Sequence, residues 1–157
     1  MCYTLSGKKW EKMGSDKMYI GEFQYSIDEK GRLSIPSHFR FQLGDKLIVV
    51  RGLEKCLYVY DETEWNKVVS KLSELSFTKK SNREFSRMFL SGAFEAEIDG
   101  KGRIAIDGRL LSHASLQKEC IIIGAGSKIE IWDKAIWTEY FQEHMQIIEE
   151  ISEELDI

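Results

Sequence analysis

Two short polar segments of this 157-residue chain contain the residue types best suited to chemistry. Residues 28–32 read Asp-Glu-Lys-Gly-Arg, and residues 99–103 read Asp-Gly-Lys-Gly-Arg. The glycine before the arginine of each segment, Gly31 or Gly102, supplies the positive φ that hairpin turns require. Glycine also lets the backbone approach a ligand closely. The cationic side chains beside it suit phosphate groups, and arginine can also bind guanine O6 and N7 through two hydrogen bonds. The pattern predicts two hairpin tips that contact DNA.

The aspartate that opens each turn is expected to fix the arginine or the turn through its own hydrogen bonds. For one turn alone, an ordinary solvated β-turn with an Asp–Arg ion pair is the better explanation. Because the same turn chemistry occurs twice, we favour a functional role. The predicted DNA-contacting residues are Asp28, Lys30, Gly31, Arg32, Asp99, Lys101, Gly102 and Arg103.

The two turns belong to an internal duplication. Residues 21–35 (GEFQYSIDEKGRLSI) match residues 92–106 (GAFEAEIDGKGRIAI) at an offset of 71. Farther along, residues 57–61 (LYVYD) match residues 129–133 (IEIWD) at an offset of 72, which one inserted residue explains. A strand pattern alone would preserve alternation but not a polar Asp-x-Lys-Gly-Arg turn. The chain therefore contains one unit twice.

Each copy is expected to contain the same elements. An alternating strand (Phe23, Tyr25, Ile27) leads into the polar turn, and a short strand to Ile35 follows it. The first copy then predicts a short helix over 36–43, β-rich runs over 46–51 and 56–60, a helix from residue 61 and a shorter helix from residue 81. The second copy repeats this plan and ends in a helix from residue 133.

One such unit is too small to be stable alone, so the two copies are expected to pair around a pseudo-twofold axis. The predicted fold class is α+β: a duplicated β-rich unit forming a pseudo-twofold double-split β-barrel with flanking helices. The first repeat with its helices covers residues 18–90, and the second, with the C-terminal helix, covers 91–157. Residues 1–17 are expected to be a leader, or a remnant of expression, without fixed structure, since Met18 offers a second start.

Charge and cysteine content exclude several classes of protein. The net charge is −4, but the stretch from residue 135 to the end holds seven acids and no lysine or arginine, so residues 1–134 together carry +3. No apolar run approaches the roughly 20 residues of a membrane helix. Three scattered cysteines and three histidines lack ligand spacing, so we expect no metal, no disulfide framework and a reducing cytoplasm.

Several motifs together resemble the MraZ family, over residues 18 to about 155. They are Gly21-x-Phe23, Ser26–Pro36, Arg51-Gly-Leu, Met88–Ala93, Ile98–Ile104 and Ile129–Trp132. The resemblance implies two AbrB/SpoVT-type DNA-binding units in one chain, with their Asp-x-x-x-Arg pairs at the DNA. It also implies a cytoplasmic, nucleoid-associated transcriptional regulator without cofactor or small-molecule substrate. Such regulators form homo-oligomeric rings on G-rich direct repeats in the promoter of the cell-division and cell-wall gene cluster.

Two rival functions stay open beside a DNA-binding regulator. A ring-forming interaction or scaffold protein would also explain the acidic C-terminal helix. A hydrolase could use Asp28 and Asp99 as a carboxylate pair, but the neighbouring arginines favour their ionised state and spoil a general acid. The chain has no G-x-S-x-G, P-loop or H-E-x-x-H motif, so we expect no enzyme.

Other cations have no single assignment. Lys79, Lys80, Arg83 and Arg87 form a solvated face, a flanking phosphate contact or an inter-subunit ion pair. Asp107-Gly108 stands where the family commonly has proline, which leaves the helix start there uncertain, and Arg109 beside it is a surface charge or a phosphate contact. The sequence indicates no partner for Arg40 or Arg51.

Overall fold

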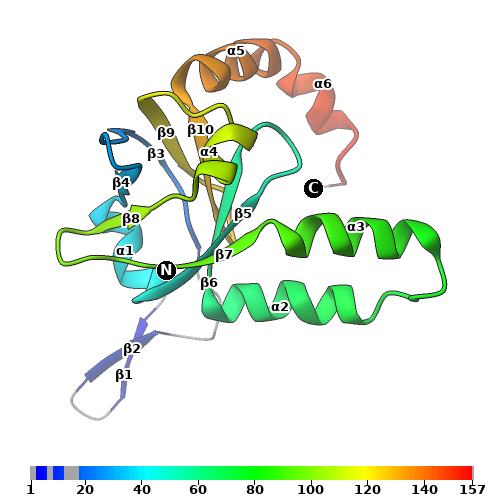
Figure 1. Ribbon diagram of the computed structural model, residues 1–157, viewed down its shortest axis with the longest axis horizontal. Coiled ribbons are helices and arrows are strands. Elements are labelled where there is room, and N and C mark those ends of the chain that lie inside the picture. Colours follow the sequence, from blue (N-terminus) through cyan, green and yellow to red (C-terminus); the bar gives the residue numbers. More distant parts are fainter. Residues whose placement is uncertain (1–2, 7–8, 13–17, 157) are drawn as a thin grey trace.

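The computed structural model describes residues 3–6, 9–12 and 18–156, with side chains from Met18 onward. These residues form an α+β fold in which every strand pair is antiparallel (Figure 1). The strands are β1 (Tyr3–Ser6), β2 (Lys9–Lys12), β3 (Glu22–Ser26), β4 (Arg32–Ser34), β5 (Lys46–Arg51), β6 (Leu57–Asp61), β7 (Ala93–Glu97), β8 (Arg103–Ala105), β9 (Glu119–Gly124) and β10 (Ile129–Asp133). The helices are α1 (Ser37–Leu43), α2 (Glu62–Ser73), α3 (Lys80–Ser91), α4 (Gly108–His113), α5 (Lys134–Met145) and α6 (Ile148–Glu153).

The main sheet interleaves the two copies. Its strand order is β3-β9-β10-β6-β5-β7, so strands of one copy lie beside strands of the other at three places. At its centre Ile129 pairs with Val59, and Ile131 pairs with Leu57. Since residues 129 and 131 are the counterparts of 57 and 59, a pseudo-twofold axis passes between β6 and β10. The edge strands β3 and β7 do not pair, so the sheet is open and a closed barrel is not confirmed.

The sheet register also locates the insertion between the copies. Cys120 lies opposite Asp133 in the second copy, as Leu47 lies opposite Asp61 in the first. The offset is therefore 73 along β5 and β9 but 72 along β6 and β10. Two extra residues precede β9, and one residue fewer separates β9 from β10. The single inserted residue inferred from the sequence is the net of these two changes.

A second, two-stranded sheet joins the polar turns. In this ribbon β4 pairs with β8, and Leu33 lies opposite Ile104, its own counterpart in the duplication. Both side chains are fully buried and belong to the core on one face of the main sheet. The other face packs a separate core, formed by residues such as Tyr58, Tyr60 and Trp132, against α2, α3 and α5. The ribbon and these three helices therefore cover opposite faces.

Aspartates begin three of the helices. Asp61 accepts a hydrogen bond from the N–H of Glu64 at 2.9 Å, and Asp133 accepts one from Ala135 at 3.1 Å. The sequence alone did not determine where α4 begins. In the structure Asp107 has the same role there, and it accepts a hydrogen bond from the N–H of Arg109 at 2.9 Å. A carboxylate at this position satisfies an otherwise unpaired helix N–H. Asp107 thus replaces proline as a helix start.

Within residues 1–17 the structure describes two strands, β1 and β2, which pair as a hairpin. The rest of this expected leader lies outside the described residues. No helix in residues 18–156 is long and apolar enough to cross a bilayer.

The ribbon core offers a direct test of the fold. Ile104→Ala removes a fully buried side chain at the pseudo-twofold axis, so the free energy of unfolding should fall by about 2–5 kcal/mol in urea titrations. Ile20→Ala is the matched control, because Ile20 is 60% exposed, and its cost should stay below about 0.5 kcal/mol. Equal costs for the two variants would contradict the buried ribbon.

Candidate nucleic-acid interface

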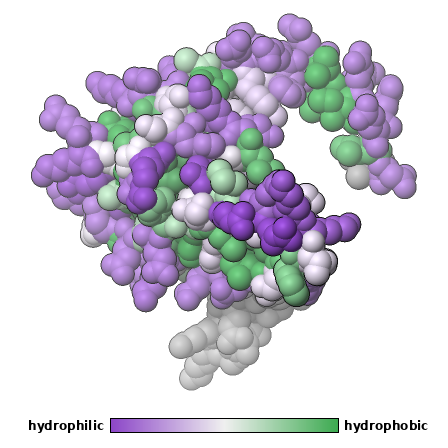
Figure 2. Space-filling view, turned by 45° about the vertical axis from the view of Figure 1, so that its right-hand side comes forward, coloured by the Kyte–Doolittle hydropathy of each residue, from purple (hydrophilic) through white to green (hydrophobic). Residues whose placement is uncertain are grey.

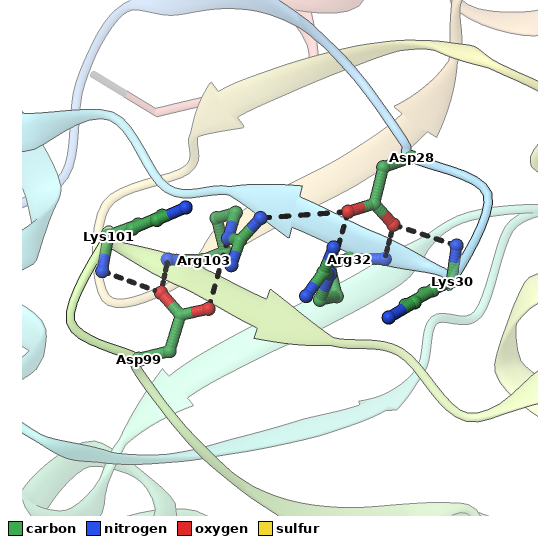
Figure 3. A network of polar contacts seen from close by, with 6 residues as sticks. All are labelled: Asp28, Lys30, Arg32, Asp99, Lys101 and Arg103. Atoms are coloured by element: carbon green, nitrogen blue, oxygen red, sulfur yellow. Dashed lines mark hydrogen bonds and ion pairs between the residues drawn. The ribbon is translucent and has the colours of Figure 1, made fainter.

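Asp28 organises the first turn through three hydrogen bonds. Its Oδ1 accepts from the backbone N–H groups of Lys30 and Arg32, both at 2.9 Å. Its Oδ2 accepts from Arg32 Nε at 2.7 Å (Figure 3). One carboxylate therefore shapes the backbone turn and also fixes the direction of the guanidinium, which are the two roles expected of it.

The second turn repeats this geometry. Asp99 Oδ1 accepts from the N–H groups of Lys101 and Arg103, both at 2.9 Å, and Oδ2 accepts from Arg103 Nε at 3.0 Å. Gly31 and Gly102 have φ values of +74° and +77°. Because L side chains rarely adopt this conformation, both turns require glycine.

The ribbon brings the two turns together. Arg32 and Arg103 lie on its outer face, opposite Leu33 and Ile104, and their side chains are 33% and 22% exposed. Arg103 Nη1 lies 3.8 Å from Asp28 Oδ2, so the two turns form one cluster. Figure 3 shows Lys101, Arg103, Arg32 and Lys30 following one another along the ribbon. We call these four residues the cation row.

All eight residues predicted from the sequence thus lie in or beside this row. The structure adds Arg40, to which the sequence gave no partner. Its guanidinium lies against Gly102, where an added Cβ would collide with it. Arg40 belongs to the first copy and Gly102 to the second, so only the pairing of the copies brings them together. In the structure, Leu111 lies over Gly31 as Arg40 lies over Gly102. Residues 40 and 111 are counterparts at the offset of 71, and this was the one signal in the sequence that could have related them.

Both aspartates are held in the ionised form. The pKa of Asp28 lies below its ordinary value, chiefly because the backbone N–H of Arg32 donates to the carboxylate, with the Arg32 guanidinium adding to the effect. The pKa of Asp99 is lowered in the same way, first by the N–H of Arg103. An ionised carboxylate has no proton to give at neutral pH. This pair is therefore unsuited to general-acid chemistry.

Three of the cations that the sequence left unassigned, Arg51, Lys80 and Arg83, have local partners away from the ribbon. Arg83 donates to the carbonyls of Phe77 and Thr78 at 2.9 and 3.1 Å, and Lys80 lies 3.6 Å from Glu84. Arg51 donates to the carbonyl of Met88 at 2.6 Å. These contacts hold the α2–α3 connection and the end of α3.

Arg109 has two partners beside its helix. It pairs with Asp107 at 3.0 Å, and its guanidinium lies 4.5 Å from the centre of the Phe94 ring. Its side chain is still 75% exposed. The counterpart of Arg109 in the first copy is His38, whose ring lies 5.9 Å from that of Phe23. The contact with the β-strand phenylalanine is therefore common to both copies.

Comparison with known proteins agrees with the duplicated architecture. A family model described as "MraZ protein, putative antitoxin-like" matches the chain twice, over residues 18–88 and 89–156. This chain belongs to the MraZ family. Two relatives called transcriptional regulator MraZ, from two strains of Lactobacillus delbrueckii subsp. bulgaricus, are each 48% identical to it over 139 residues. The matched region covers 88% of this chain and 97% of each relative. Membership of the MraZ family, expected from the sequence motifs, is confirmed.

The cause of the lowered pKa values can be tested by a carboxyl NMR titration. Asp28 and Asp99 should titrate below the ordinary value of 3.8. In an Arg32→Gln variant the pKa of Asp28 should rise only part of the way, because the backbone N–H of residue 32 remains. A full return to the ordinary value would show that the guanidinium, and not the backbone, is the main cause.

The same shift fixes the sign of a pH effect. The pKa of each aspartate is lower in the folded protein than in the unfolded chain. The ionised carboxylates therefore stabilise the folded protein at pH values above the unfolded-state pKa, and this stabilisation is lost as the pH falls through the folded-state pKa. The turns should therefore keep their hydrogen bonds down to pH values below about 4.

Proposed function

We propose that this protein is a sequence-specific DNA-binding transcriptional regulator that reads duplex DNA with the β4–β8 ribbon. The observation that carries the proposal is the cation row, in which two copies of one turn meet on a single exposed ribbon. The relatives' names, transcriptional regulator MraZ, support the same role. The B-DNA major groove, about 12 Å wide, admits a two-stranded β-ribbon.

The arginines and the lysines of the cation row have different roles in this proposal. Arg32 and Arg103 are fixed through Nε by an aspartate, which leaves their terminal nitrogens to donate to guanine O6 and N7 or to a phosphate. Each Asp–Arg pair is close to neutral, so these arginines recognise bases but add little to the electrostatic attraction of the DNA. Lys30 and Lys101 are exposed at the two ends of the row and supply the attraction to phosphates.

One subunit offers few such contacts, so a single site should bind weakly at physiological salt. We propose that the protein acts as a homo-oligomeric ring, which presents many ribbons to G-rich direct repeats in the promoter of the cell-division and cell-wall gene cluster. The family resemblance is the source of this promoter. It is also the source of the protein's location at the nucleoid in the cytoplasm, and of the double-split barrel as the description of the paired repeats. Simultaneous engagement could raise affinity by about 10²–10⁴.

Exposed apolar side chains support self-association. They lie on α2, α3 and the segment between them, and on α5 and α6. Figure 2 shows green areas on the projecting parts of the molecule. They include Phe77 (80% exposed), Met88 (63%), Met145 (54%) and Leu155 (54%). Exposed apolar patches are typical of contacts between proteins. The same surface would serve a scaffold protein, so DNA binding itself is the deciding measurement.

The Arg32→Ala/Arg103→Ala double variant tests the reading surface. Loss of a base-reading arginine should cost roughly 1–3 kcal/mol of binding free energy and relax specificity. Gel-shift titrations against operator and unrelated duplexes at several salt concentrations measure both effects. If the double variant folds, assembles and binds its operator as the wild type does, the ribbon is not the reading surface.

Ring assembly and repeat spacing can be tested together. Light scattering at micromolar protein should give a mass well above the 18.2 kDa of one chain. Affinity should rise steeply from one operator repeat to three, and inserting roughly 5 base pairs between repeats, half a helical turn, should abolish the gain. A monodisperse monomer would remove the ring, and indifference to phasing would show that the oligomer is not the DNA-reading unit.

A further inference from the structure

The two turns are related by the duplication but differ in charge. At the second position of the turn, the first copy has Glu29 and the second has Gly100. Above the turn glycine, the first copy's turn has Leu111, whose Cδ1 lies 3.7 Å from a Cβ added to Gly31, and the second copy's turn has Arg40. With these neighbours the first turn carries two acids and two cations, whereas the second carries one acid and three cations.

Arg40 is placed differently from the arginines of the cation row. Arg32 and Arg103 are each hydrogen-bonded to an aspartate. In the part of the chain with described side chains, no carboxylate lies within ion-pairing distance of Arg40. The residue is exposed, and its stem and guanidinium lie across Gly102. Its position is thus restricted by packing while its charge is not neutralised.

We propose that Arg40, together with Lys101 at the Gly102 turn, forms a binding subsite for a backbone phosphate of DNA, and that the first turn lacks an equivalent subsite. The inference rests on the proposed DNA-binding function and extends it beyond the duplicated residues. A guanidinium suits phosphate because its planar donors can bind two oxygens at once. Gly102 itself is buried beneath Arg40, so the exposed guanidinium, and not the backbone of the turn, is the group that would meet the phosphate.

The subsite gives each subunit a direction on DNA. A pseudo-twofold subunit with identical turns would present the same surface after a half-turn and would fit a palindromic site. With one turn close to neutral and the other carrying two net positive charges, the two orientations of the subunit on a given site differ in energy. Direct repeats require such a directional reader, since every subunit must lie the same way along the duplex.

Arg40→Gln and Arg40→Glu test the subsite. Because each phosphate contact contributes about 0.9 to the slope of log affinity against log salt, Arg40→Gln should lower the slope by about one per bound subunit, and Arg40→Glu should lower it further. Affinity for a duplex with one operator repeat should fall about tenfold in Arg40→Gln, as for loss of one charge-assisted hydrogen bond. Lys71→Gln, on α2 at the opposite face, removes the same charge and should bind as the wild type does.

A reciprocal variant uses the other copy. Leu111→Arg in the Arg40→Gln background should restore the slope, because it moves the extra cation to the first turn. Thermal unfolding of each variant separates loss of binding from loss of fold. If Arg40→Gln and Arg40→Glu are folded and have the slope of Lys71→Gln, the subsite is wrong. If Arg32→Ala/Arg103→Ala then still weakens operator binding and relaxes specificity, the ribbon function stands without the subsite. If that variant also binds normally, the ribbon itself is not the DNA surface.

Discussion

The pairing of Leu33 with Ile104 is the contact on which the arrangement of the site depends. Both side chains are fully buried, so the ribbon must lie with this face against the main sheet. Since neighbouring residues of a strand point to opposite faces, Arg32 and Arg103 are then directed outward. Shifting the pairing by one residue would bury an arginine and expose Leu33 or Ile104, which makes the register strongly determined. A hydrophobic pair on the pseudo-twofold axis thus positions two polar turns that are 71 residues apart in the chain.

Local chemistry could be predicted from the sequence because it depends on neighbours in the chain. The turn geometry follows from Asp28, Gly31 and their counterparts, and the α+β class follows from strand alternation and helix capping. Pairing of the two copies was expected, because one unit is too small to be stable alone. The strand order of the interleaved sheet could not be predicted, because a duplication does not specify which strands of one copy lie beside which strands of the other. The net insertion of one residue hid two changes, which only the pairing of Cys120 with Asp133 separates. Arg40 was missed for a related reason: its neighbour Gly102 lies in the other copy.

Charge is distributed over the molecule in a way that the net value of −4 conceals. The acid-bearing helices α5 and α6 lie apart from the β4–β8 ribbon: they are at the top and upper right of Figure 1, whereas β4 and β8 are at its left. At physiological ionic strength, interactions between exposed charges are largely screened beyond about 8 Å. The acidic helices therefore leave the attraction of Lys30 and Lys101 for phosphates nearly intact. They also disfavour a polyanion on their own side of the molecule.

Duplication and divergence have opposite consequences for DNA reading. Duplication supplies two turns of the same Asp-x-Lys-Gly-Arg pattern, and the Asp–Arg hydrogen bonds keep both in the same geometry, with Nε–Oδ2 distances that agree within 0.3 Å. Divergence at residues outside those hydrogen bonds, Glu29 against Gly100 and Arg40 against Leu111, alters charge without disturbing the turn. A protein built in this way can keep one recognition geometry while it loses the twofold equivalence of its two halves. Loss of equivalence would suit the proposed head-to-tail ring on direct repeats, because each subunit would then have one preferred orientation along the duplex.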